Sequence, residues 1–336
     1  MSKKRVLFYC SSPENVKVQK FYQIDFDIIR KNGNQLVLTS NRWDLFKWWK
    51  YDALFVYFYT WGAFTSFIAR LGFRKVYFTG GIDALNRETT TYRRFLTQKI
   101  FFLICYFLST KCIIVSDNDW HNIEKEYYGL LKKKLVKSYH VIDVEKFYDS
   151  SRERNCTFIT ICWQGAEINV QRKGVDKSLL LFSYLRHKKE FAKSHYIIVG
   201  RKGAGTPYIE RIIKELNLED SVSLLGEVSE EKKIDLMKSA KYYFQLSKYE
   251  GFGLAALEAL AAGNIVIHTN TGGLKYVVGS SGIIISENMT DGSLEVFYKN
   301  LLTFDYNEVI KGQDRIRRDF TYKKRLYDFA KIMMSD

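Results

Sequence analysis

The strongest constraint on the fold is a regular alternation, along all 336 residues, of short apolar runs with segments of helical periodicity. Apolar runs lie at 6–9, 36–38, 54–58, 76–78 and 113–115, and again at 158–161, 196–199, 222–225, 242–246, 265–268 and 283–285. Between them, apolar residues recur at helical spacing, as in the stripe from Ile209 to Leu216. Strands that alternate with helices predict parallel sheets covered by helices on both faces.

The two series of strands join near residues 147–156, and at roughly 150 residues per domain the chain holds about two domains. We therefore predict an α/β protein with two doubly wound, Rossmann-like domains, 1–150 and 151–319, that face a central cleft. The polar segment Tyr306–Asp336 is predicted to be helical, and its last part, about 320–336, is expected to complete the N-terminal domain. Ligands of such sheets bind beyond the carboxyl ends of the strands.

The net charge is uneven along the chain. In total, 52 Lys and Arg oppose 37 Asp and Glu, which gives +15. Residues 1–150 contain 24 basic and 14 acidic residues (24 − 14 = +10), and the remaining 186 contain 28 and 23 (28 − 23 = +5). This asymmetry suggests an acidic partner for the first half, such as a nucleic acid, an anionic membrane or a phosphorylated ligand. A general bias of composition explains it equally well.

Basic and aromatic residues are densest in the segment from Arg42 to Lys50, which contains three tryptophans. It is either an interfacial helix that places Trp and Phe among lipid headgroups or a short surface helix whose aromatics pack into the core. The uncharged run Ala53–Ala69 is at the short limit for crossing a bilayer and is predicted to be a buried strand followed by a short helix. Five cysteines without a CxxC pair indicate reduced thiols, and the five histidines show no metal-ligand spacing.

The segment most informative about chemistry runs from Ser247 to Gly263. Glu250 and the glycines after it form a loop that leaves a strand, and 254–262 is predicted to be a helix. Glycines let the backbone approach a ligand, and a helix N-terminus offers N–H groups to a phosphate. Glu258 lies about 6 Å further along the helix axis. Two carboxylates beside an anion-binding helix end could hold the two hydroxyl-bearing ends of a nucleotide sugar. Alternatively, Glu258 is a solvated helix residue and Glu250 a capping carboxylate.

Several motifs in the second half resemble those of the retaining GT-B-fold glycosyltransferases of family 4, the glycosyl transferases group 1. Glu250 and Glu258 enclose the family's glutamate-seven-residues-glutamate motif in the setting Ser-x-x-Glu-Gly-Phe-Gly-Leu. The further matches follow in the family's order between about residues 157 and 285: Arg172-Lys173-Gly174-Val175-Asp176, Ile198-Val199-Gly200, Leu225-Gly226-Glu227-Val228 and Thr271-Gly272-Gly273. The resemblance implies the GT-B fold.

The resemblance also implies roles for individual residues. Glu250 would contact the donor sugar, Glu258 the ribose, and Lys173 the leaving diphosphate. Asp83 would act beside the sugar, together with Glu250 and Lys173 as catalytic residues. The remaining donor-binding positions would be Gly251, Phe252, Gly253, Leu254, Gly226, Glu227 and Val228, with Arg172 or Arg201 as a second positive charge. No metal and no cofactor are expected, because basic side chains and helix ends replace a metal in this fold.

The N-terminal half departs more from the family. The family often has His-Gly-x-Asp near the sugar, whereas this chain has Gly80-Gly81-Ile82-Asp83, so that any role of the histidine is absent. Gly80 and Gly81 are expected on the acceptor side. The family also places an arginine shortly before the lysine of Lys-Gly, and none precedes Arg172 at that position.

The resulting expectation is a glycosyltransferase that moves a sugar from a nucleotide-sugar donor to a glycan or a polyprenyl-phosphate-linked acceptor, in cell-surface polysaccharide biosynthesis. Because the charge lies on the half expected to meet the acceptor, we expect a cytoplasmic protein bound peripherally to an anionic membrane at its inner face, with no nucleic acid as partner. A nucleotide-sugar epimerase of the same fold and a non-catalytic glycosyltransferase-like subunit are the alternatives. A nucleic-acid binder is the third, although no nucleic-acid module signature is present.

Overall fold

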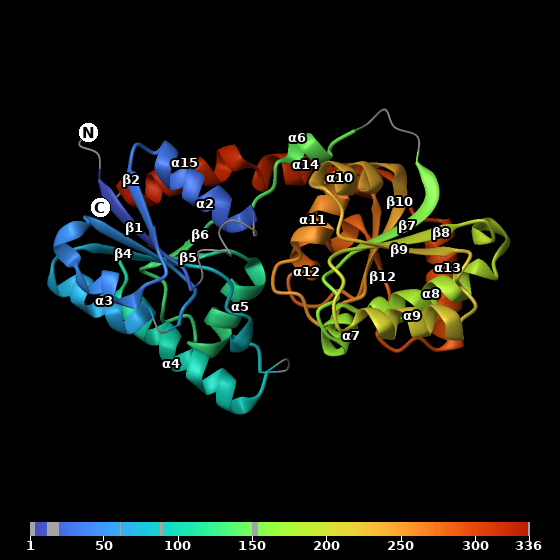
Figure 1. Ribbon diagram of the computed structural model, residues 1–336, viewed down its shortest axis with the longest axis horizontal. Coiled ribbons are helices and arrows are strands. Elements are labelled where there is room, and N and C mark those ends of the chain that lie inside the picture. Colours follow the sequence, from blue (N-terminus) through green and yellow to red (C-terminus); the bar gives the residue numbers. More distant parts are fainter. Residues whose placement is uncertain (1–3, 12–19, 61, 88–89, 150–153, 335–336) are drawn as a thin grey trace. The chain divides into compact units, whose positions relative to one another are not determined.

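The computed structural model describes residues 4–11, 20–60, 62–87, 90–149 and 154–334. The chain divides into two compact units, drawn in Figure 1: an N-terminal unit of Met1–Val141 with Asp319–Asp336, and a C-terminal unit of Ile142–Arg318. The division therefore falls between residues 141 and 142, earlier than the predicted 150 and 151. Lys233 lies 5.4 Å over the ring of Phe147, and Arg317 lies 3.4 Å over that of Tyr148. These contacts tie the residues after Val141 to the C-terminal unit.

The N-terminal unit contains a parallel sheet of six strands in the order β2-β1-β3-β4-β5-β6. The strands are β1 Arg5–Tyr9, β2 Gln35–Thr39, β3 Ala53–Tyr57, β4 Lys75–Thr79, β5 Lys111–Ile114 and β6 Leu135–Lys137. Five of them lie where an apolar run predicts a strand. The sixth, β6, was missed because its three residues form no apolar run.

Helices cover both faces of this sheet, as Figure 1 shows. The helical elements are α2 Lys20–Lys31, η1 Arg42–Phe46, η2 Trp48–Lys50, α3 Gly62–Leu71, η3 Asp83–Leu85, α4 Tyr92–Leu108, α5 Asp117–Glu126 and α15 Tyr322–Met334. One core cluster joins α2 and α15 to one face through residues such as Tyr22 and Phe329. The other joins α3, α4 and α5 to the opposite face through residues such as Phe102 and Ile123. Within the segment 53–69, the structure thus shows a buried strand, Ala53–Tyr57, and a helix that begins at Gly62.

Helix α15 is fixed to the N-terminal unit by a buried ion pair. The Arg325 guanidinium donates to both carboxylate oxygens of Asp25 in α2, at 2.5 and 2.7 Å, and also to the carbonyl oxygen of Ser138 at 2.6 Å. Both charged side chains are almost fully buried. A buried charge is tolerated only when it is paired and hydrogen-bonded, so this contact specifies where the end of the chain docks.

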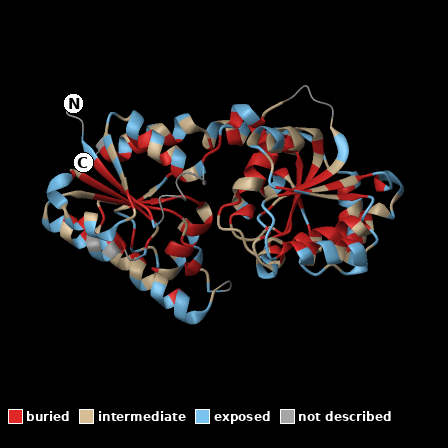
Figure 2. Cartoon of the chain, viewed as in Figure 1, coloured by how far each residue is buried: buried red, intermediate tan, exposed pale blue. Residues whose placement is uncertain are grey.

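The C-terminal unit contains a second parallel sheet of six strands in the order β12-β11-β10-β7-β8-β9. The strands are β7 Asn155–Ile161, β8 His195–Val199, β9 Val222–Gly226, β10 Ala240–Gln245, β11 Ile265–His268 and β12 Ile283–Ile284. The helices are α6 Val144–Phe147, α7 Glu167–Lys173, α8 Val175–Arg186, η4 Lys189–Phe191, α9 Thr206–Glu215, α10 Glu230–Ser239, α11 Leu254–Ala261, α12 Leu274–Val277, η5 Gly279–Ser281, α13 Asp291–Leu302 and α14 Asn307–Asp319. Figure 2 shows the strands of each unit as its buried centre. The predicted strands of this half are confirmed.

Each sheet has a point at which the strand order reverses. In the N-terminal unit it lies between β1 and β3, and in the C-terminal unit between β7 and β10, because successive strands are added on opposite sides of β1 and β7. Doubly wound sheets bind their ligands beyond the carboxyl ends of the strands at such a reversal point, because the loops on its two sides run to opposite faces of the sheet. Among the helices that the structure describes, none is both long and apolar enough to cross a membrane.

Candidate active site

The reversal point of the C-terminal sheet is marked by an ion pair between two residues predicted from sequence. Lys173 lies at the end of α7, which follows β7, and Glu250 lies in the loop that follows β10. The Lys173 Nζ donates to Glu250 Oε2 at 2.5 Å, although 77 residues separate them. Both side chains remain partly exposed, so the pair is accessible to a ligand.

The position of Lys173 depends on the glycine that follows it. Gly174 ends α7 in the left-handed conformation, with φ of 67°. A Cβ atom there would lie 1.8 Å from the carbonyl oxygen of Leu246, so only glycine lets the end of α7 pack against the end of β10. The Lys248 N–H also donates to the Arg172 carbonyl oxygen at 2.9 Å. The Lys-Gly sequence thus brings the lysine across the reversal point to Glu250.

Glu250 is held by a polar network that the sequence analysis missed. Gln245 Nε2 and the Ser247 hydroxyl each donate to Glu250 Oε2 at 3.4 Å, and Gln245 Nε2 also donates to Ser247 Oγ at 2.8 Å. The Tyr243 hydroxyl donates to Gln245 Oε1 at 3.2 Å. Gln245 and Ser247 are buried. A glutamine at the end of an aromatic strand, Tyr-Tyr-Phe-Gln, was the available signal, because a buried amide requires partners.

The Gly272–Gly273 loop packs directly on the backbone of the Glu250 loop. The Gly273 N–H donates to the Glu250 carbonyl oxygen at 2.6 Å. A Cβ at Gly272 would lie 2.2 Å from that oxygen, and one at Gly273 would lie 2.5 Å from the Gly251 and Phe252 carbonyl oxygens. Side chains at these positions would displace the loop, which explains why both residues are glycine.

Helix α11 begins beside Glu250. Gly253 precedes it with φ of 95°, and no side chain of the described residues caps its N-terminus. Residues Gly251 to Leu254 therefore connect Glu250 to the N-terminus of α11, and the dipole of this helix attracts anions to that end.

Glu258, one turn into α11, is buried rather than solvated. Its Oε2 accepts a hydrogen bond of 2.8 Å from Lys233 in α10. Lys233 also pairs with Glu230 at 3.2 Å. The alternative of a solvated helix residue is therefore wrong, and Lys233 is a second residue that sequence reasoning missed. No motif of the sequence indicated it, because its partner lies on another helix.

The remaining predicted donor residues surround the carboxyl edge of the same sheet. Gly226 ends β9 with φ of 77°, and Glu227 and Val228 follow it in the loop. Arg201 follows β8 and lies 5.4 Å over the Trp163 ring, while Arg172 projects from α7; both are exposed. The structure thus places both arginines at this edge and favours neither as the second positive charge.

The residues predicted on the acceptor side lie at the carboxyl end of β4. Gly80 has φ of 115°, and Asp83 begins η3 and is exposed. Asp119 in α5 faces the same loop: a Cβ at Gly81 would lie 3.6 Å from Asp83 Oδ1 and 4.0 Å from Asp119 Oδ2. Burial, together with the nearby Asp83 carboxyl, raises the pKa of Asp119 to about 8.

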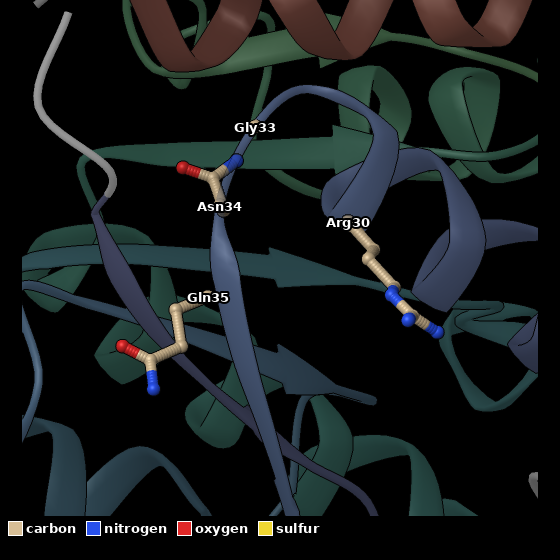
Figure 3. Close-up of a pocket in the computed structure, with 4 residues that line it drawn as sticks. All are labelled: Arg30, Gly33, Asn34 and Gln35. Atoms are coloured by element: carbon tan, nitrogen blue, oxygen red, sulfur yellow. The ribbon is translucent and has the colours of Figure 1, made fainter.

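A surface pocket elsewhere in the N-terminal unit is not a candidate site. It is lined by Arg30, Gly33, Asn34 and Gln35, where α2 turns into β2. That is the amino end of β2, opposite the edge at which such sheets bind ligands. Figure 3 shows the Arg30 side chain directed away from Asn34 and Gln35, so the polar groups do not converge.

No group of three or more His, Cys, Asp or Glu side chains is placed to hold a metal ion within the described residues. The structure likewise records all five cysteines as free thiols.

Comparison with known proteins agrees with the motifs. Residues 169–295 match the family Glycosyl transferases group 1, and this match covers both members of the Lys173–Glu250 pair. The chain is 26% identical over 153 residues to O-antigen chain mannosyltransferase B of Escherichia coli, covering 44% of this chain and 40% of that protein. It is 31% identical over 102 residues to GDP-mannose:cellobiosyl-diphosphopolyprenol alpha-mannosyltransferase of Xanthomonas oryzae, covering 30% and 27%.

A likeness to solved structures extends over the whole chain. The structure of HepE from Anabaena in complex with UDP and glucose superposes with a TM-score of 0.76 at 15% identity, covering 99% of this chain and all of that one. The chain therefore has the GT-B fold of glycosyltransferases, as predicted. The resemblance to glycosyl transferases group 1 is confirmed over residues 169–295. The sequence matches to the two mannosyltransferases span at most 40% of their length.

Proposed function

We propose that this protein is a glycosyltransferase that moves a sugar from a nucleotide-sugar donor to a glycan or lipid-linked acceptor in the synthesis of a cell-surface polysaccharide. The observation that carries the proposal is the Lys173–Glu250 pair of 2.5 Å at the reversal point of the C-terminal sheet. A cation and a carboxylate side by side match the two demands of the donor, an anionic diphosphate and a hydroxyl-bearing sugar.

Each residue of the C-terminal site has a distinct task in the proposed reaction. Lys173 and the N-terminus of α11 stabilise the negative charge that develops on the departing diphosphate, and this replaces a metal ion. Glu250 accepts hydrogen bonds from the sugar hydroxyls. Glu258 accepts hydrogen bonds from the ribose, and the turn from Gly226 to Val228 holds the base by its backbone.

We propose that the configuration at the anomeric carbon is retained, as the resemblance to family 4 implies. The acceptor oxygen then attacks from the face that the diphosphate leaves. The new bond forms between this oxygen and the anomeric carbon as the bond to the diphosphate breaks. The acceptor proton passes to the leaving phosphate oxygen, so that no protein base is required for this step.

The acceptor is proposed to meet the N-terminal unit, at Gly80, Gly81 and Asp83. The name of the relative from Xanthomonas oryzae includes a substrate linked to diphosphopolyprenol, and this supports a lipid-linked acceptor for the present protein. We place the protein in the cytoplasm, peripherally bound to the inner face of the membrane, since polyprenyl-linked acceptors reside in a bilayer. An anionic bilayer fits the net charge of +15, whereas no nucleic acid is proposed as a partner.

The test is transfer of labelled sugar from a panel of UDP-, GDP- and dTDP-sugars to a lipid-linked acceptor fraction. We expect one donor to support transfer, and NMR of the product to show the anomeric configuration of the donor. Glu250→Gln should lower the rate at least about a hundredfold, by analogy with the loss of one preorganised polar contact to the transition state. The exposed Glu167→Gln serves as the matched control and should transfer as the wild type does.

A nucleotide-sugar epimerase would convert the donor in the absence of any acceptor, and NMR of the donor incubated alone would reveal this. A non-catalytic subunit would give neither conversion nor transfer. Wild-type turnover of Glu250→Gln would contradict the assignment of the site.

A further inference from the structure

Exposed apolar side chains gather at the edge of the N-terminal sheet opposite to its proposed acceptor residues. Helices of a doubly wound sheet run antiparallel to its strands, so every segment that precedes a strand lies at the amino edge. Four exposed residues occupy such positions: Trp49 before β3, Phe73 before β4, Phe107 before β5 and Leu130 before β6. The four strands that they precede, β3, β4, β5 and β6, are neighbours in the sheet, so the four residues lie along one edge.

A basic residue accompanies each of these side chains. Lys50 follows Trp49, Arg74 follows Phe73, Lys111 follows Phe107, and a run of three lysines, 132–134, follows Leu130. Residues 92–111 and 127–134 contain no acidic residue. Lys134 Nζ donates to the Phe107 carbonyl oxygen at 2.7 Å, which joins the last two positions directly.

Two of the aromatic residues are held in an unfavourable backbone conformation. Phe73, which is 94% exposed, has φ of 55°, and Tyr128, which is 87% exposed, has φ of 51°. Both follow the end of a helix, α3 or α5, where glycine is the usual residue and another residue costs about 1 kcal/mol. Rings exposed to this extent have little contact with the rest of the unit, so they are available to a partner outside the fold.

The outward face of α3 continues the same surface. Phe64, Phe67 and Leu71 are spaced as one stripe of the helix and are all at least half exposed. The Phe64 ring contacts Phe101 of α4 at 5.5 Å, and α4 adds exposed Leu96 and Ile100. At the other side, the Trp48 ring packs over Gly72, and Arg74 Nε donates to the Trp48 carbonyl oxygen at 3.0 Å. The exposed side chains of η2, α3 and α4 therefore belong to one continuous surface.

We propose that this surface, which we term the amino-edge patch, docks the protein on an anionic lipid bilayer. It comprises Trp49, Phe64, Phe67, Leu71, Phe73, Ile100, Phe107, Tyr128 and Leu130 with the basic residues between them. Aromatic and aliphatic side chains enter the headgroup region, and lysines and arginines at the same level are attracted to anionic lipids. A second copy of the chain is a poor occupant, because two basic patches repel each other. This proposal adds a docking surface to the peripheral membrane location proposed above, and it does not depend on the chemistry at Glu250.

The test compares binding of the full chain to vesicles of phosphatidylcholine and of an equimolar mixture with phosphatidylglycerol, by co-sedimentation. The informative variant is Phe73→Gly combined with Tyr128→Gly, since glycine relieves the backbone at both positions and preserves folding. We expect the wild type to prefer the anionic vesicles, and the variant to bind them about tenfold more weakly with an unchanged or higher melting temperature. Lys132→Glu with Lys133→Glu should weaken binding by about tenfold as well.

The matched control is Val296→Ser combined with Ile310→Ser, two exposed apolar residues of the C-terminal unit, which should bind vesicles as the wild type does. Stabilisation by a nucleotide sugar should be unaffected in the glycine variant, so that failure of docking is distinguishable from failure of the donor site. Three results would overturn the proposal: equal binding of the glycine variant and the wild type, no preference for anionic lipid, or a wild-type dimer in light scattering that the glycine variant dissociates.

Discussion

Glu250 is the residue on which most of the site converges. Three side chains, Lys173, Gln245 and Ser247, donate to the same oxygen, Oε2, so the carboxylate is held in one orientation. Gln245 itself is oriented by the Tyr243 hydroxyl. This arrangement identifies Gln245 as a positioning residue that acts through Glu250.

Gln245→Leu should therefore lower kcat about tenfold or more, with little change in the KM for the donor, because Glu250 remains present but is less fixed. Steady-state kinetics measures this. In a Glu250→Gln background the same substitution should have almost no further effect, since the group it positions is already altered. Equal effects of Gln245→Leu in both backgrounds would show that Gln245 supports the fold alone.

Asp119 gives the N-terminal unit a pH-dependent stability. Its pKa is about 8 in the native state because it is buried beside Asp83, whereas an unfolded aspartate titrates at about 3.9. Between these two values the native state keeps a proton that the unfolded chain loses, so the free energy of unfolding falls as the pH rises.

Melting temperatures of the wild type should accordingly decrease as the pH rises from about 5 to about 9. Asp119→Asn, which cannot ionise, should flatten this dependence and melt higher than the wild type at the alkaline end. An identical slope in both proteins would mean that Asp119 is ionised in the native state.

At the scale of elements, the alternating apolar runs predict almost all strands because a parallel strand buried on both faces must be apolar throughout. The short strand β6 lacks this signal. The predicted domain boundary, between residues 150 and 151, lies later in the chain than the observed one, between residues 141 and 142. Residues Phe147 and Tyr148 belong to the C-terminal unit because they contact Lys233 and Arg317, which lie far from them in the sequence. In the site, motifs located Lys173 and Glu250. Gln245 carries only the signal of a glutamine at the end of an aromatic strand, and Lys233 carries none, because its partner Glu258 lies on another helix.

Helix α15 depends on one buried contact. Arg325→Ala leaves the buried Asp25 carboxylate without its bidentate partner and should lower the free energy of unfolding by about 3–5 kcal/mol. Lys324→Ala, which removes a partly exposed pair with Asp328, should cost less than about 1 kcal/mol. Denaturant unfolding of both variants measures the difference. If the two lost the same small amount, the Arg325–Asp25 pair would not be what fixes α15.

At the scale of the whole molecule, the two units share one architecture but present different chemistry. The C-terminal unit gathers a cation, two carboxylates and a helix N-terminus at the carboxyl edge of its sheet. The N-terminal unit carries the larger share of the positive charge, together with the amino-edge patch. This division matches the proposal that one unit binds the donor and that the other unit lies at a membrane.

The central claim, that Lys173 and Glu250 form a nucleotide-sugar site, is tested most directly by the melting temperature in the presence of UDP-, GDP- and dTDP-sugars. Ligands that bind the native state raise it, by an amount equivalent to about 2.7 kcal/mol at a hundredfold excess over Kd. We predict that one nucleotide sugar stabilises the wild type and the matched control Lys177→Ala, and that Lys173→Ala loses this stabilisation. Stabilisation of Lys173→Ala equal to that of the wild type, or no response of the wild type to any nucleotide sugar, would contradict the claim.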